Sequence, residues 1–227
     1  MHPRPARPFR IITGSEDNTA AYYEGPPFKF KGTKNDHGRY CQAVRYSPDG
    51  AFWASAGFDG KLFLYEGKDS ELVAEVTDGK AAHAGGIYGL SWSPDGKHLL
   101  SASGDKTCKV WDIETRKVVR TFDMGSEVAD QQLACLWNSG SGDKLISVSL
   151  SGNINFLDNR TGGNGIVEMV VRGHNKPITA MSRVDSKTVY TGDSEGRLVR
   201  WNTEDGRADE VKGKGHAGAQ VSLKNRF

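Results

Sequence analysis

The chain has 227 residues, which is enough for one or two domains with a substantial core. Its 30 basic and 28 acidic residues give a net charge of +2, too balanced to indicate binding to nucleic acid or to an anionic membrane. No run approaches the ~20 apolar residues that a membrane-spanning helix requires, and the first residues lack the apolar segment of a secretory signal. We therefore expect neither nucleic acid nor membrane as a partner.

A small unit recurs five times along the chain. Each time, a polar residue in a turn rich in Gly and Ser precedes an aromatic or apolar residue by six positions; the pairs are Asp17/Tyr23, Asp59/Tyr65, Asp105/Trp111, Ser151/Leu157 and Glu195/Trp201. The steps between successive turns are 42, 46, 46 and 44 residues. A period in the forties with a Trp-Asp ending, as at Trp111-Asp112, is typical of the WD40 repeat, whose four strands form one blade of a β-propeller.

This periodicity predicts an all-β fold, an incomplete WD40 β-propeller that spans residues 1–227 as one domain. The expected parts are a half blade of two strands at 9–33, complete blades at 37–78, 83–124, 127–171 and 174–212, and the truncated start of a further blade at 213–227, opened by His216. Propellers close with about four to eight blades, and each blade needs neighbours to cover its faces. We therefore expect the chain to be part of a propeller.

Three cysteines, Cys41, Cys108 and Cys135, are widely spaced and form no Cys-x-x-Cys pair. An odd number at such spacing predicts reduced, buried thiols of a cytoplasmic protein rather than disulfides or a zinc site.

Four residues of the best-formed repeat, His83, Ser101, Asp105 and Trp111, could be taken for a Ser/His/Asp catalytic set. Nucleophilic catalysis would need an exposed hydroxyl, an oxyanion site and a pocket, and no Gly-x-Ser-x-Gly elbow is present. A buried hydrogen-bond relay from indole to hydroxyl to imidazole to carboxylate is the better interpretation, because buried polar groups must find such partners. Ser103 is an alternative to Ser101 as the hydroxyl.

Histidines occur once per repeat, at His37, His83, His174 and His216, without a second ligand nearby, so we do not expect them to bind a metal. The glycine-rich segment 138–144 lacks the spacing of a phosphate-binding loop. We expect no cofactor, no metal and no enzymatic activity.

The segment Glu24–Lys31 is unusual, because Phe28 and Phe30 alternate with lysines after Pro26-Pro27. Pro-Pro favours an extended backbone, which would place both rings on one side. The segment is then either an outer strand with its apolar side on the sheet or an aromatic and charged surface that binds a partner. Residues 130–132, Asp-Gln-Gln, are either a solvated turn or a second contact point.

With these segments in view, the chain resembles the actin-interacting protein 1 family. The resemblance covers about residues 7–222, and its most specific segments are Glu24–Lys31 and Asp130–Leu133; others are 7–12, 14–18, 86–95, 101–107 and 149–156. Members of this family are similar in having two hinged seven-bladed propellers, so the resemblance implies that this chain supplies the middle and later blades of the first propeller.

The resemblance also implies a function. Members of the family bind actin filaments decorated with cofilin and promote their disassembly, without covalent chemistry, in the cytoplasm and on the actin cytoskeleton. Carried over position by position, the partner-binding residues would be Glu16 and Asp17 of one turn, with Phe28 and Phe30. Two alternatives remain, a generic WD40 scaffold for another protein complex and, with the least support, a propeller enzyme.

Overall fold

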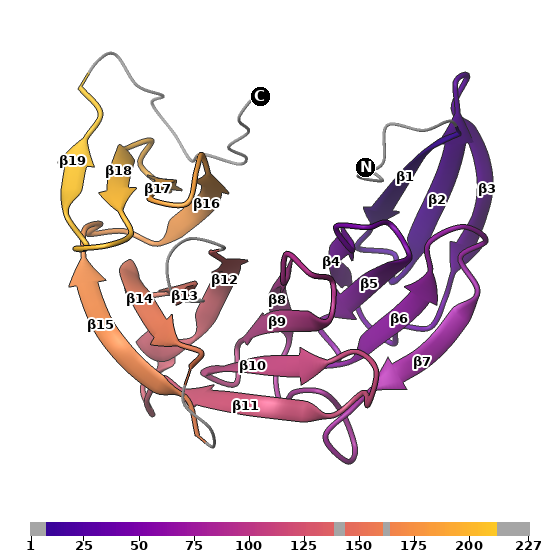
Figure 1. Cartoon of the computed structure of the whole chain (residues 1–227), viewed down its shortest axis with the longest axis horizontal. Helices are drawn as coiled ribbons and strands as arrows, with labels where there is room; N and C mark the ends of the chain where they lie inside the picture. Colours follow the sequence, from indigo (N-terminus) through magenta and orange to yellow (C-terminus); the bar gives the residue numbers. More distant parts are fainter. Residues whose placement is uncertain (1–7, 139–143, 161–163, 213–227) are drawn as a thin grey trace. The chain divides into compact units, whose positions relative to one another are not determined.

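The structure is a computed structural model that describes residues 8–138, 144–160 and 164–212. Within these residues it has nineteen β-strands and a single turn of 3-10 helix, η1 (Val128–Asp130) (Figure 1). The strands form one three-stranded and four four-stranded antiparallel sheets, each a meander of consecutive strands. Such repeated sheets are blades, so the structure confirms the predicted all-β fold and incomplete β-propeller.

The sheets follow one another along the chain. The first comprises β1 (Phe9–Gly14), β2 (Ala20–Gly25) and β3 (Lys29–Lys34); the second β4 (Cys41–Tyr46), β5 (Phe52–Gly57), β6 (Leu62–Glu66) and β7 (Leu72–Val76); the third β8 (Ile87–Trp92), β9 (His98–Ser103), β10 (Thr107–Asp112) and β11 (Val118–Asp123). The fourth comprises β12 (Gln132–Trp137), β13 (Lys144–Ser149), β14 (Asn153–Asp158) and β15 (Ile166–Arg172), and the fifth β16 (Ile178–Arg183), β17 (Thr188–Asp193), β18 (Leu198–Asn202) and β19 (Ala208–Glu210).

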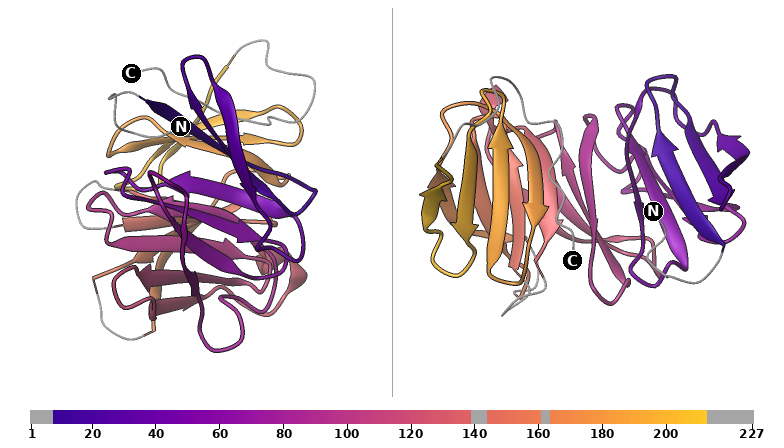
Figure 2. Two further views of the ribbon diagram at one scale, coloured as in Figure 1. Left: turned by 90° about the vertical axis from the view of Figure 1, so that its right-hand side faces the viewer. Right: turned by 90° about the horizontal axis from the view of Figure 1, so that it is seen from above.

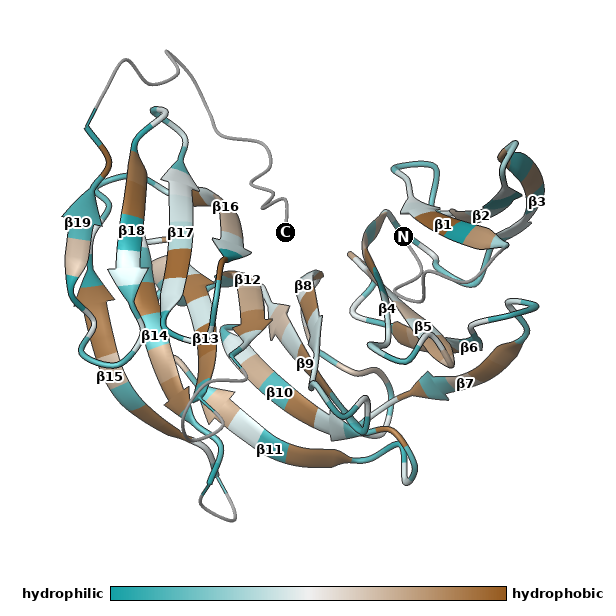
Figure 3. Ribbon diagram, turned by 45° about the horizontal axis from the view of Figure 1, so that its top comes forward, coloured by the Kyte–Doolittle hydropathy of each residue, from teal (hydrophilic) through white to brown (hydrophobic). Residues whose placement is uncertain are grey.

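These strands form two compact units, divided within the third sheet: one extends to residue 105 and includes 109–119, and the other includes 106–108 and continues from residue 120. The first unit has a core of aliphatic and aromatic side chains that includes Leu62, Ile87 and Trp111. The core of the second unit includes Phe156 and Trp201. Views from two further directions show the twist of the individual sheets (Figure 2). Hydrophobic and hydrophilic residues follow one another along β15 and β18 (Figure 3).

The first sheet differs from the sequence prediction. Two strands were expected within residues 9–33, and the structure has three. Asp17 lies in the turn between β1 and β2, as Asp59 does between β5 and β6, so β1 to β3 correspond to the second, third and fourth strands of a blade. The described residues include no strand on the other side of β1.

The strands of the second to fifth sheets lie within 37–78, 83–124, 127–171 and 174–212, except that β15 ends one residue beyond, at Arg172. The expected start of a further blade at 213–227, with His216, lies outside the described residues, and so do residues 139–143 of the glycine-rich loop. The assignment of 1–227 to one partial propeller domain stays a prediction.

Two structural features recur among the blades. The inner strand of each four-stranded blade has a register shift after its first residue, at Cys41, Ile87, Gln132 and Ile178. A bulge re-aims the side chain at the start of the strand, which is the end that faces the polar networks described below. The twin turns 47–50 and 93–96 are held by a serine hydroxyl that donates to an aspartate, over 2.6 and 2.5 Å respectively.

Candidate functional site

The third blade brings the four predicted relay residues together. His83 Nδ1 lies 2.8 Å from Asp105 Oδ2, and His83 Nε2 lies 2.6 Å from Ser101 Oγ. The Trp111 indole donates to the same hydroxyl over 2.9 Å. Ser103 instead donates to the carbonyls of Gly85 and Gly86, so Ser101 is the hydroxyl of this relay.

The geometry of this relay fixes its protonation. The Asp105 carboxylate can only accept, so His83 Nδ1 carries the proton that is directed at it, and in the neutral ring Nε2 then accepts from the Ser101 hydroxyl, which accepts from Trp111. Burial lowers the pKa of His83 from its ordinary 6.5, and although hydrogen bonding to Asp105 opposes this, nearby Lys109 adds to it. His83 is therefore uncharged at neutral pH in the folded chain. Because Ser101 is fully buried with its hydroxyl engaged on both sides, the arrangement joins strands rather than presenting a nucleophile.

The second blade carries a variant of this network. His37 Nδ1 lies 3.2 Å from Asp59, and its Nε2 lies 2.8 Å from Ser55 Oγ. Tyr65 replaces the tryptophan, and its hydroxyl donates to Asp36 over 2.9 Å. Burial disfavours the Asp59 anion, but hydrogen bonds from the backbone and from His37 outweigh that effect and hold its pKa below 3.8.

The fifth blade has the same network with a different acid. His174 lies 2.9 Å from Asp193 and 2.7 Å from Thr191 Oγ1, to which Trp201 also donates. Glu195, which precedes Trp201 by six residues in the repeat pattern, is not the acid of this network. Glu195 is exposed and pairs with Lys176 over 3.1 Å. The spacing of ten residues from the hydroxyl to the tryptophan, shared with Ser101 and Trp111, would have found Thr191.

The fourth blade has no histidine in its network. Ser147 donates to Gln132 Oε1 over 2.7 Å, and Asn155 Nδ2 donates to the same oxygen over 3.1 Å. All three side chains are buried. Gln132 is therefore neither part of a solvated turn nor a contact point, which corrects both interpretations of residues 130–132 at this position. Asp130 belongs to η1 and accepts a hydrogen bond from the Glu127 amide.

The aromatic segment after β2 is a turn and not a continuous extended strand. Residues 26–28 connect β2 to β3, so the expectation that Pro26-Pro27 extends the chain was wrong. Phe28 is 46% exposed and Phe30 is 60% exposed, and the Phe30 ring meets Tyr23 edge to face at 5.9 Å. Neither phenylalanine is packed away on the sheet.

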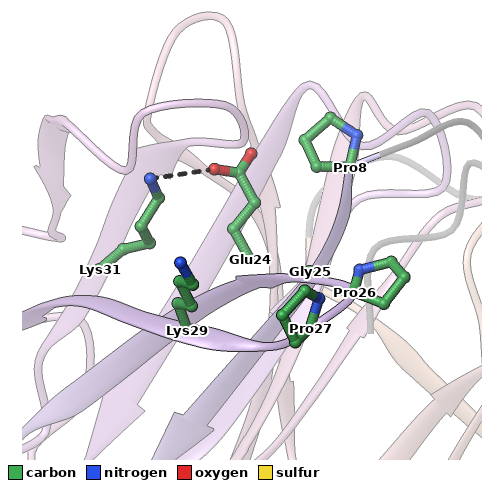
Figure 4. Close-up of a pocket in the computed structure, with 7 residues that line it drawn as sticks. All are labelled: Pro8, Glu24, Gly25, Pro26, Pro27, Lys29 and Lys31. Carbon is green, nitrogen blue, oxygen red and sulfur yellow. Dashed lines mark ion pairs between the residues drawn. The ribbon is translucent and has the colours of Figure 1, made fainter.

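A hollow of about 530 Å³ adjoins this turn (Figure 4). Its lining comprises Pro8, Glu24, Gly25, Pro26, Pro27, Lys29 and Lys31. Glu24 forms ion pairs with Arg10 at 3.2 Å and with Lys31 at 3.3 Å, and the second is drawn in Figure 4. The Lys31–Glu24 pair is partly exposed, and such surface pairs contribute little stability, about 0–1 kcal/mol.

The acidic turn between β1 and β2 lies at the other end of β2. Asp17 accepts hydrogen bonds from the Thr19 amide and hydroxyl, at 3.0 and 2.7 Å, and these bonds lower its pKa. Glu16 is exposed in the same turn. Since β2 has six residues, the two ends are about 17 Å apart at ~3.4 Å per residue. The structure does not bring Glu16 and Asp17 together with Phe28 on one rim.

The repeats match a known family. Residues 28–66 and 76–112 match the family described as "WD domain, G-beta repeat". The first match ends with β6 and the second with β10, the third strands of their blades. The first match begins just before the outer strand β3 and the second at the last residue of the outer strand β7, and each ends in the third strand of the next blade.

Similarity to individual proteins covers nearly the whole chain. The chain is 56% identical over 220 residues to "Actin-interacting protein 1" of Drosophila melanogaster, and 50% identical over 222 residues to "WD repeat-containing protein 1" of Xenopus tropicalis. The chain is a WD40-repeat relative of actin-interacting protein 1. These alignments cover 96% of this chain but 35% of each relative, so the chain spans about a third of the length of the relatives it matches.

Among the described residues, no helix has the length and hydropathy needed to cross a membrane. The same residues contain no cluster of three or more His, Cys, Asp or Glu side chains suited to hold a metal ion.

Proposed function

We propose that this chain binds actin filaments through the outer surfaces of its first blades and acts, without catalysis of its own, in the cofilin-dependent disassembly of those filaments in the cytoplasm. The observation that carries the proposal is the 56% identity over 96% of the chain to a protein named for interaction with actin. The role of cofilin rests on the family resemblance of the segments 24–31 and 130–133.

The structure supports this proposal because several of the proposed contact residues are exposed to solvent. Phe28 and Phe30 are exposed on the β2–β3 hairpin, next in sequence to Lys29 and Lys31, and aromatic residues are enriched in the centres of protein interfaces. Glu16 and Asp17 form a second exposed group at the other end of β2. A partner that contacts both groups must extend along the side of the blade for about 17 Å.

The mechanism follows from differential binding. A ligand shifts an equilibrium only by the difference in its affinity for the two states. Disassembly is promoted if the chain binds cofilin-decorated or broken filaments more tightly than intact bare ones. The proposed contact residues lie in the first sheet, where the pairing of β2 with β1 and β3 holds them in place before binding.

Co-sedimentation of the 227-residue chain with actin filaments, with and without cofilin, tests the proposal. We expect more of the chain in the pellet when cofilin is present. Equal amounts in both conditions would contradict the cofilin-dependent part, and absence from both pellets would contradict filament binding. In that second case, a pull-down that recovers another protein would favour the generic scaffold function.

The Phe30→Ala variant tests the surface itself. Because Phe30 is 60% exposed, we expect weaker pelleting by a factor of about ten, a typical hot-spot loss, while the thermal melt stays within about 2 °C of the parent. Leu72→Ala is the matched control, since Leu72 is 48% exposed on β7 of the neighbouring blade. A large drop in melting temperature for Phe30→Ala would instead show that the ring packs.

A further inference from the structure

Three aromatic rings from the second and third blades form a continuous row, Tyr40, Phe58 and Tyr88, which we call the aromatic row. Tyr40 and Phe58 meet edge to face with ring centres 5.9 Å apart, and Phe58 and Tyr88 do the same at 5.1 Å. Tyr40 is 49% exposed, and the other two are partly exposed. None of these residues belongs to the relays or to the proposed site.

The row is held in a fixed orientation by the backbone beneath it. Phe58 donates its amide to the Tyr40 carbonyl over 2.9 Å. A methyl group added at Gly86 would come 3.1 Å from the Phe58 ring, and one added at Gly104 would come 3.1 Å from the Tyr88 ring. Glycine at these two positions lets the rings lie directly against the chain. Rings ordered before binding lose little conformational entropy when a partner covers them.

The backbone at one end of the aromatic row is hydrogen-bonded to the acidic turn between β1 and β2. The Cys41 amide, directly after Tyr40, donates to the Ser15 carbonyl over 3.0 Å, so the strand that begins after Tyr40 is bonded to the turn that carries Glu16. Arg39, next to Tyr40, is exposed. Tyrosine, phenylalanine and arginine beside an acidic residue make the composition of an interface centre with a polar rim.

We propose that the aromatic row is the apolar centre of a contact with the actin filament, with Glu16 at its edge. This inference rests on the proposed function and deepens it. It assigns the Glu16 end of β2 to a surface that reaches the third blade, separate from the surface of Phe28 and Phe30 at the other end. The complementary feature on the filament is an apolar side chain that covers Phe58 and Tyr88, with a basic group facing Glu16.

Two variants of the full chain test the proposal, Tyr88→Ala and Tyr88→Phe, with Leu72→Ala as a control at an exposed apolar residue outside the aromatic row. The dissociation constant comes from co-sedimentation over a range of filament concentrations with cofilin present, and a thermal melt is recorded for each variant. We expect Tyr88→Ala to bind at least tenfold more weakly, Tyr88→Phe to keep most of the affinity because it keeps the ring, and Leu72→Ala to bind like the parent.

A photoreactive phenylalanine at position 40 provides a second measurement that does not depend on the folding of a truncated side chain. We expect it to cross-link to actin in the filament. Parental affinity of Tyr88→Ala, or no actin cross-link from a chain that pellets normally, overturns this inference and leaves the proposed function standing. A parent chain that does not pellet with filaments refutes the proposed function, and this inference falls with it.

Discussion

Truncation of Trp111 is the sharpest test of the relay. The side chain is fully buried in the core of the first unit, and its indole donates to Ser101 over 2.9 Å. Deleting a buried tryptophan costs about 3–5 kcal/mol, because transfer free energy is lost and a cavity remains. At roughly 2–4 °C per kcal/mol for a chain of this size, Trp111→Ala should lower the melting temperature by about 6–20 °C.

The Trp111→Phe variant separates the ring from its hydrogen bond. Phenylalanine keeps much of the buried apolar volume but cannot donate to Ser101, whose hydroxyl still reaches His83. Loss of one bond to a buried partner costs about 1–3 kcal/mol. We therefore expect a smaller loss than for Trp111→Ala in urea unfolding followed by circular dichroism. A Trp111→Ala chain that melts like the parent would refute the assignment of this residue to the core.

Two further predictions concern the other networks. The pKa of His83 is lowered in the folded chain, so the unfolded chain binds more protons below about pH 6.5, and the free energy of unfolding should fall as the pH is lowered through that value. Asp59, whose pKa is also lowered, contributes stability that is present above its ordinary pKa of 3.8 and is lost as the pH falls below it. A series of melts from about pH 7.5 to about pH 2 measures both losses. A His83→Gln variant whose stability loss between about pH 7 and 5 matches that of the parent would contradict the His83 part. Gln132→Leu should cost about 1–3 kcal/mol, because Ser147 and Asn155 lose their shared acceptor, with no change in the pH dependence; a urea midpoint equal to that of the parent would show that the bonds contribute nothing.

The fold could be predicted because it depends on a repeated local pattern. A polar turn followed by an aromatic residue, with a period in the forties, determines where strands begin and end without any knowledge of long-range contacts. The central relay was predictable for the same reason. His83, Ser101, Asp105 and Trp111 come from one repeat in which each residue type is of the expected kind.

The variant networks could not be predicted from the spacing of the turn residues. In the fifth blade the acid follows the hydroxyl by two residues, at Asp193 after Thr191, and not by four as in the third blade. Asp193 accepts from the amides of Glu195 and Arg197, so the turn is organised around the earlier acid. Which carboxylate reaches His174 depends on the path of the backbone through that turn, and sequence spacing does not report it.

The aromatic hairpin shows a second limit. Pro26 and Pro27 restrict φ in a turn as well as in an extended segment, so local preference did not locate the bend between β2 and β3. Treating residues 24–31 as one extended strand also concealed the third strand of the first sheet.

The arrangement of the networks explains how a repeat fold can offer binding residues at fixed positions. Each four-stranded blade has its own buried polar network, and every network connects the start of the inner strand, or the loop before it, to an adjacent strand of the blade. Satisfied buried networks specify one strand register, because a shift by one residue would leave several polar groups without partners. Tyr40 directly precedes β4, a strand fixed in this way, and Glu16 and Phe28 lie in short turns of the first sheet, whose strands are paired in register along β2. Substitutions in the turns should therefore change affinity with little change in stability, and substitutions in the networks should do the reverse.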